Sequence, residues 1–220
     1  MAQEKEGLSG EALKQAASES VAGADISERV RDLTLKALQS RQFDFAAFRD
    51  VMKSVTEGIS IGAEQRGQDA RRAIAEAFKG MDLAMTKAAQ ASSLALKELA
   101  DRGRQFSDKE LKQALDQIKA MEGEFLDSVR QVAGTTRGTV KTGWEELVQH
   151  AQRAGTDTGA VVSETMREFS QRMATTMTET TLAGMETARQ MGERFAQISS
   201  GFLSAMAMAI RPEKDEGKKK

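Results

Sequence analysis

Residues 129–169 read VRQVAGTTRGTVKTGWEELVQHAQRAGTDTGAVVSETMREF, and the spacing of their uncharged residues decides the fold. Uncharged residues recur at every eleventh position on three tracks, which start at Val129, Val132 and Thr136 and continue beyond this stretch. No position on these tracks is charged, although charged residues make up 30% of the chain. Three positions in eleven correspond to about 3.67 residues per turn, so the pattern predicts a helix with one uncharged stripe.

A weaker form of the same repeat occupies the first half of the chain. Its two clearest tracks contain Phe48, Ile59, Ala70, Met81 and Ser92, and Met52, Ala63, Ile74, Met85 and Leu96. The eleven-residue period is therefore a property of most of the sequence, and long helices are expected in both halves.

The stripe is weakly apolar, because Thr, Gly, Ala, Val and Met fill it instead of Leu and Ile. Each glycine in a helix interior costs about 1 kcal/mol relative to alanine, and the β-branch of threonine restricts its side chain in a helix. Such a helix is not expected to persist alone in water. We expect it to become ordered against another helix or against an apolar surface.

The chain is predicted to be all-α, with long amphipathic helices in an elongated antiparallel bundle or an extended coiled coil and no sheet. Strand-like alternation and hairpin turns are absent from the sequence, and its one proline, Pro212, lies close to the end. The predicted order is a polar lead-in (1–8), short helices (9–40), a long amphipathic helix (43–102), a long helix with the eleven-residue repeat (107–209) and a disordered charged tail (211–220).

Local signals mark the boundaries of the second long helix. Ser107 and Glu110 have the spacing of a capping box, which predicts a helix start. An unbroken helix over 107–209 would extend roughly 150 Å. We therefore expect at least one bend, near the glycine clusters at 134–138 or 155–159.

Few residues of the chain could carry chemistry. It has no cysteine and one histidine, His150, which has no second imidazole with which to share a metal and is expected at the surface or at the edge of the stripe. The carboxylate pairs Glu145/Glu146 and Glu164/Glu168 lack the Glu-x-x-His elements of di-metal bundles. The glycines do not form a phosphate-binding loop. The sequence therefore predicts no enzymatic activity, no catalytic residue, no cofactor and no metal site.

Charge and hydropathy narrow the possible partners. The 32 basic and 33 acidic residues nearly balance, which is untypical of a nucleic-acid-binding protein. The N-terminal residues are charged and lack the apolar run of a signal peptide. The uncharged run 195–210 is shorter than the roughly 20 residues of a spanning helix. We expect a soluble, cytoplasmic protein without a transmembrane span, free or at a granule or membrane surface.

The stripe is the candidate functional site, because an apolar helix face can bind a partner helix or an apolar surface. Trp144 flanks it and is expected to fill a groove between helices or to anchor an interface. The predicted binding residues are the larger apolar members of the stripe: Val129, Val132, Val140, Leu147, Val162, Phe169, Met173, Met191, Phe195, Ile198, Phe202 and Met206.

Residues 43–209 resemble the phasins, small bacterial proteins that coat polyhydroxyalkanoate granules, in being cysteine-free, helical and rich in Ala, Met, Gln and Lys. The Thr/Gly/Val stripe from Val140 to Thr180 is also similar to the lipid-surface helices of perilipins and synucleins. The resemblance is one of composition and pattern. It implies a non-enzymatic coat protein that self-associates and binds granule surfaces.

Two functions fit these patterns, and the sequence leaves both open. The first is an amphipathic protein whose stripe orders on a hydrophobic granule or lipid surface; the absence of a lysine excess on its polar face favours a neutral surface. The second is a structural scaffold, a bundle or oligomeric coiled coil in which the stripes pack against one another, with Phe169, Phe195 and Phe202 in its core. Both predict a homo-oligomer, and neither predicts a nucleic-acid partner.

Overall fold

The computed structural model describes residues 9–39, 45–101 and 108–176. These residues contain no strand, so the all-α prediction is confirmed for them. The elements in chain order are α1 (Gly10–Ser20), α2 (Ile26–Gln39), α3 (Phe45–Glu64), the 3-10 turn η1 (Gly67–Asp69), α4 (Ala70–Asp101), α5 (Asp108–Thr135), α6 (Gly138–Ala154) and α7 (Asp157–Thr176).

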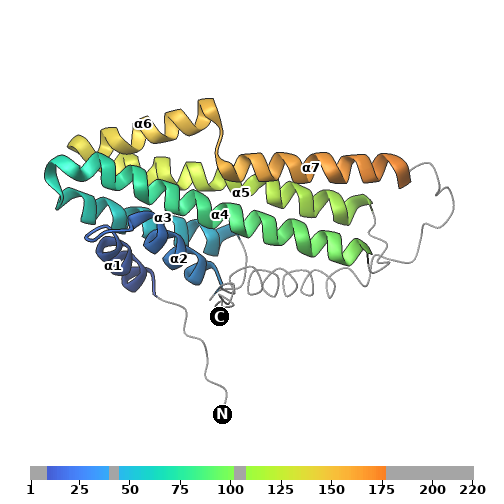
Figure 1. The fold of residues 1–220 in the computed structure, drawn as a ribbon, viewed down its shortest axis with the longest axis horizontal. Helices are drawn as coiled ribbons and strands as arrows, with labels where there is room; N and C mark the ends of the chain where they lie inside the picture. Colours follow the sequence, from blue (N-terminus) through green and yellow to red (C-terminus); the bar gives the residue numbers. More distant parts are fainter. Residues whose placement is uncertain (1–8, 40–44, 102–107, 177–220) are drawn as a thin grey trace, which may run out of the picture.

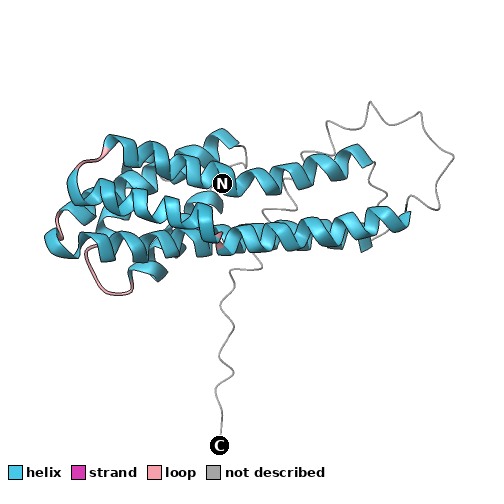
Figure 2. Cartoon of the chain, turned by 90° about the horizontal axis from the view of Figure 1, so that it is seen from above, coloured by secondary structure: helices cyan, strands magenta, loops and turns pink. Residues whose placement is uncertain are grey.

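The helices α4 and α5 run side by side along the long axis of the molecule (Figure 1). At one end, which we call the thick end, α3 and α6 pack against them, α1 lies on α3, and α2 lies on α4. At the other end, which we call the arm, α7 packs against residues 89–101 of α4 and 108–118 of α5. The arm extends away from the thick end in both views (Figures 1 and 2).

The two short N-terminal helices agree with the prediction for 9–40. The side chain of Ser9 caps α1 by accepting a hydrogen bond from Ala12 N at 3.2 Å. Glycines let these helices approach their neighbours closely: a Cβ on Gly58 would lie 2.1 Å from the carbonyl oxygen of Lys14, and one on Gly80 would lie 2.3 Å from that of Ser27. Main chain therefore packs directly on main chain where α1 meets α3 and where α2 meets α4.

The predicted single helix over 43–102 is wrong. Helix α3 ends at Glu64 and α4 begins at Ala70, and the chain reverses between them through η1. Gly67 has a φ of +56°, a left-handed conformation that favours glycine. The reversal lets the apolar faces of α3 and α4 meet in one core, whereas a straight helix would leave both faces in water.

The bend predicted for the second long helix is confirmed, at both glycine clusters. The chain folds back between α5 and α6, and α6 returns beside α5. Between α6 and α7 it shifts sideways at Gly155, whose φ is +84°, and continues along the arm (Figure 1). The predicted start is close to the observed one, Asp108, although Ser107 lies outside the described residues. The predictions for 1–8, 177–209 and 211–220 also lie outside them.

Candidate functional site

The described members of the predicted binding stripe lie inside the molecule. Val129, Val132, Val140, Val162 and Phe169 are buried, and Leu147 is half-buried against the core. They contact helices of their own chain, which is one of the two kinds of cover, another helix or an apolar surface, that the sequence left open. The side chains of the remaining predicted members lie outside the described residues: Met173, Met191, Phe195, Ile198, Phe202 and Met206.

The partner of the stripe is the weaker repeat in the first half of the chain. Phe48, Ile59 and Met81 from that repeat share one core with Val129 and Val140. Folding at η1 and between α5 and α6 brings the two stripes face to face. The described part of each stripe thus receives from the same chain the apolar cover that its composition requires.

Trp144 is the largest fully buried side chain of the thick end. Its ring lies 6.5 Å from that of Phe78 in an edge-on arrangement, and its Nε1–H donates a hydrogen bond of 2.9 Å to Ser60 Oγ on α3. The prediction that Trp144 fills a groove between helices is confirmed. This contact ties α6 to α3, two helices that are far apart in the sequence.

Two carboxylates hold the junction between α6 and α7, and we call this group of residues (Asp82, Glu122 and 155–159) the corner. Asp82 on α4 is almost fully buried, and its carboxylate accepts hydrogen bonds from Asp157 N at 2.9 Å and from Thr158 N at 3.2 Å. The hydroxyl of Thr158 donates to Asp82 Oδ1 at 2.7 Å. A carboxylate is favourable here, because the free N–H groups at a helix N-terminus carry a partial positive charge.

Glu122 on α5 completes the corner. Thr156 Oγ1 donates to Glu122 Oε1 at 2.6 Å and accepts a hydrogen bond from Gly159 N at 2.8 Å, so Thr156 is the N-cap of α7. Gly159 leaves room for the carboxylate, since a Cβ there would lie 2.3 Å from Glu122 Oε1. The glycine cluster at 155–159 was predicted as a bend, but its two carboxylate partners were not. The one signal in the sequence concerns Asp82, which is the single charged residue in 80–86.

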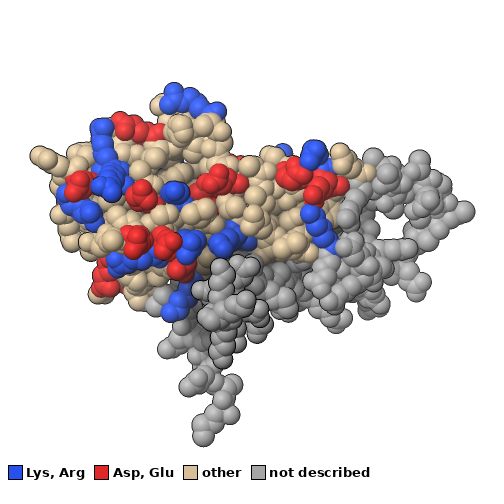
Figure 3. Space-filling model, in the orientation of Figure 1, with Lys and Arg blue, Asp and Glu red and all other residues tan. Residues whose placement is uncertain are grey.

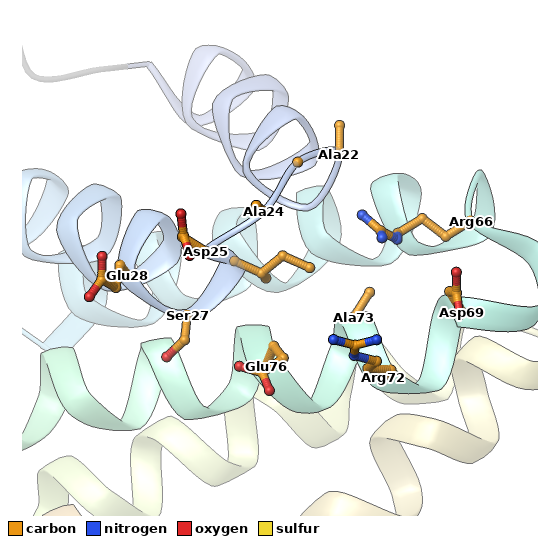
Figure 4. A pocket seen from close by; sticks show the side chains of 12 residues that line it. Ala22, Ala24, Asp25, Ser27, Glu28, Arg66, Asp69, Arg72, Ala73 and Glu76 are labelled. Atoms are coloured by element: carbon orange, nitrogen blue, oxygen red, sulfur yellow. The ribbon is translucent and has the colours of Figure 1, made fainter.

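A pocket of about 720 Å³ lies at the thick end, between the α1–α2 turn and the first turns of α4. Asp25 and Glu28 lie toward one side of it, Arg66, Asp69 and Arg72 lie toward the other, and Glu76 lies between them (Figure 4). Arg66 donates a hydrogen bond of 2.5 Å to Val21 O at the end of α1. Arg66 thus ties the end of α1 to the turn that follows α3.

The predicted surface position of His150 is confirmed, because its side chain is exposed. Carboxylates of the two predicted pairs form ion pairs on the surface: Glu146 with Arg71 at 3.6 Å, and Glu168 with Lys97 at 2.5 Å. Within 9–39, 45–101 and 108–176, no three His, Asp or Glu side chains are grouped so that they could hold a metal ion.

Glu164 lies on the exposed face of α7 and pairs with Arg167 one turn later. The hydrogen bond from the Arg167 guanidinium, 2.5 Å to Oε1, lowers the pKa of Glu164, and the guanidinium charge adds to this effect. A carboxyl group with a lowered folded-state pKa stabilises the folded state above its unfolded pKa, and this contribution is lost as the pH falls through the folded-state pKa.

We therefore expect NMR titration to place the pKa of Glu164 below that of an ordinary glutamate. In Arg167→Gln, the pKa of Glu164 is expected to rise toward the ordinary value, because the hydrogen bond and the charge of the guanidinium are both lost. An unchanged Glu164 pKa in this variant would show that the ion pair does not form in solution.

None of the described helices combines the length and the apolar character that a membrane-spanning segment requires. Among known protein families, a model described as a family of unknown function (DUF6781) matches residues 3–212. No curated protein and no solved structure matches the chain.

Proposed function

The chain belongs to the family of unknown function DUF6781, and we propose that it is a non-enzymatic helical protein that associates with a hydrophobic granule or lipid surface and self-associates there, as phasins do. The surface-binding residues in this proposal are the C-terminal part of the stripe, from Val162 to Met206. The N-terminal part is excluded, because Val129, Val132 and Val140 pack within the thick end.

The observation that carries this proposal is the composition of the buried face of α7. Over its described side chains, this face consists of Thr158, Val162, Thr165 and Phe169. The hydroxyl of Thr165 donates to Val161 O of the same helix at 2.9 Å, so it requires no partner from α4 or α5. Beyond Thr158, whose hydroxyl donates to Asp82 on α4, this face can therefore exchange one apolar neighbour for another at little cost in hydrogen bonds.

The sequence beyond α7 supports the same proposal. The stripe continues through Met191, Phe195, Ile198, Phe202 and Met206, and residues 195–210 contain no charge. On the face of the molecule shown in Figure 3, acidic and basic side chains are interspersed over the helices. A surface with both signs of charge favours a neutral apolar target over an anionic bilayer.

Flotation with oil droplets coated with phosphatidylcholine tests this proposal. The purified full chain is expected to float with the droplets, and Phe195→Ser combined with Phe202→Ser is expected to weaken binding at least about tenfold, because each buried phenylalanine contributes about 1.5–3 kcal/mol. The matched control carries Glu186→Ser and Arg189→Ser on the charged side of the same segment and is expected to bind like the wild type. Equal flotation of both double variants would contradict the proposal.

A structural scaffold is the second candidate, and the packing of the stripes within the thick end favours it. There the apolar residues of α5 and α6 already serve helix–helix association, as the contact of Trp144 with Ser60 illustrates. Sedimentation velocity separates the two candidates. If the two phenylalanine substitutions dissociate an oligomer while no form of the protein floats with droplets, the scaffold is the correct function.

A further inference from the structure

The attachment of α7 to the arm differs from that of α1 and α2 to the thick end. Glycine contacts hold α1 and α2 backbone to backbone on their neighbours. By contrast, the described side chains that α7 buries are two threonines, Val162 and Phe169. Its ion pair between Lys97 and Glu168 is partly exposed, so solvent and salt weaken it.

Polar contacts at the corner add to the apolar contact that α7 makes with the arm through Val162 and Phe169 and the partly buried Val161 and Met166. In the described part of the chain, every hydrogen bond to the Asp82 carboxylate comes from Asp157 or Thr158. In return, this carboxylate satisfies two of the N–H groups that the first turn of α7 leaves free. If α7 moved away from α4, all these bonds would break together, so the contact has two discrete states.

Next to these contacts the chain has a point about which it can turn. The backbone hydrogen bonds of α6 end with Gly155 N donating to Ala151 O, and those of α7 begin with Ala160 N donating to Thr156 O. Only Gly155 and Thr156 separate the two helices. Because Gly155 has no Cβ, its φ and ψ can change widely without a steric penalty.

From these observations we infer that the corner is a latch: Asp82 and Glu122 hold α7 on the arm, and α7 swings away as one rigid helix about Gly155 when they release it. Release exposes Val162 and Phe169 together with the arm residues that they cover, Leu96, Leu115 and Ile118. This inference rests on the proposed function, because the exposed face joins the surface-binding part of the stripe and a hydrophobic surface would stabilise the open state.

Distance measurements between spin labels test the latch without any droplet. Since the chain has no cysteine, labels can be attached at Lys119→Cys on α5 and Ser170→Cys on α7, both at exposed positions. In the labelled Asp82→Ala variant, the fraction of molecules with a second, longer distance is expected to rise about tenfold, the effect of losing one or two hydrogen bonds to a charged group. Asp82→Asn retains one acceptor oxygen and is expected to have a smaller effect in the same direction.

The matched control is Glu76→Ala, which removes an exposed carboxylate from the same helix, one that lines the pocket beside α2 and makes no contact in the corner. It is expected to leave the distance distribution unchanged. An unchanged distribution in both Asp82 variants would overturn the latch. A second label pair, on α2 and α6, measures distances at the thick end. If these distances broaden in the Asp82 variants together with those of the arm, the latch is also overturned, because α7 then does not open alone.

Crosslinking connects the latch to the surface. A short bis-maleimide between Lys97→Cys and Glu168→Cys should tie α7 to α4, and one between Lys14→Cys and Glu57→Cys should tie α1 to α3; the native side chains form ion pairs at both places. The first crosslink is expected to weaken droplet binding about tenfold, the second to leave it unchanged. Equal binding of the two crosslinked forms overturns the latch and leaves the proposed function standing. If no form binds droplets, the proposed function fails, and the spin-label distances still decide whether the latch exists.

Discussion

Trp144→Ala is expected to lower the free energy of unfolding by about 3–5 kcal/mol, the usual cost of removing a large aromatic side chain from a core. Trp144 is fully buried, and its side chain contacts Phe78 on α4 and Ser60 on α3. Truncation would leave a cavity beside Phe78 and remove the hydrogen bond to Ser60 Oγ. Urea denaturation followed by circular dichroism measures the change, because fluorescence would lose its only tryptophan.

The control for this prediction is Trp144→Phe, which retains an aromatic ring and removes the indole N–H. Ser60 keeps a hydrogen bond in this variant, because its own hydroxyl donates to Thr56 O at 2.8 Å. We therefore expect Trp144→Phe to be clearly less damaging than Trp144→Ala. A loss below about 1 kcal/mol in the alanine variant would contradict the packing of α6 against α3.

Gly58→Ala is expected to destabilise the protein by about 2 kcal/mol or to detach α1. Its Cβ would lie 2.1 Å from Lys14 O and 2.7 Å from the Ala17 side chain, so the two backbones would have to separate. Alanine is the better helix former by about 1 kcal/mol, but overpacking a close contact costs about 1–3 kcal/mol or more. The clash involves backbone atoms, which cannot rotate away. We therefore expect the packing cost to exceed the gain in helix propensity, so that the free energy of unfolding falls.

The same substitution at Gly123 on α5 provides the matched control. A Cβ on Gly123 would meet no atom within 4 Å outside its own helix backbone, so Gly123→Ala is expected to stabilise the protein by up to about 1 kcal/mol. Thermal unfolding of the two variants is therefore expected to shift in opposite directions. Shifts in the same direction would show that helix propensity, and not the close approach of α1 to α3, governs Gly58.

Local signals account for what the sequence predicted correctly. Helix propensity and the eleven-residue period are properties of neighbouring residues, and they predicted the all-α class and the two short N-terminal helices. Glycine clusters at 134–138 and 155–159 predicted the bends for the same reason, since glycine is a weak helix former. The reversal at Gly67 was missed, because the repeat continues across it from Ile59 to Ala70 without a change of period.

What covers an apolar face is not a local property. The period indicates that Val129 and Val140 share a face with one another, but it does not indicate whether a surface, a second copy or the same chain lies against them. Asp82 was missed for the same reason, because its hydrogen-bond partners Asp157 and Thr158 lie 75 and 76 residues away. The sequence thus predicts the bend at the corner but not the carboxylates that hold it.

Hydrogen exchange of the full chain, with and without phosphatidylcholine-coated oil droplets, shows directly whether the C-terminal part of the stripe binds a surface while the thick end stays closed. We expect the droplets to change the exchange of residues 157–209, while amides in α3 and α6 keep the rates of the free protein, because the thick end stays closed. Exchange that is unchanged everywhere would show that the chain does not associate with the surface. Exchange that changes in α3 and α6 as much as in α7 would show that the whole bundle opens, which contradicts the division into a closed thick end and a surface-binding C-terminal stripe.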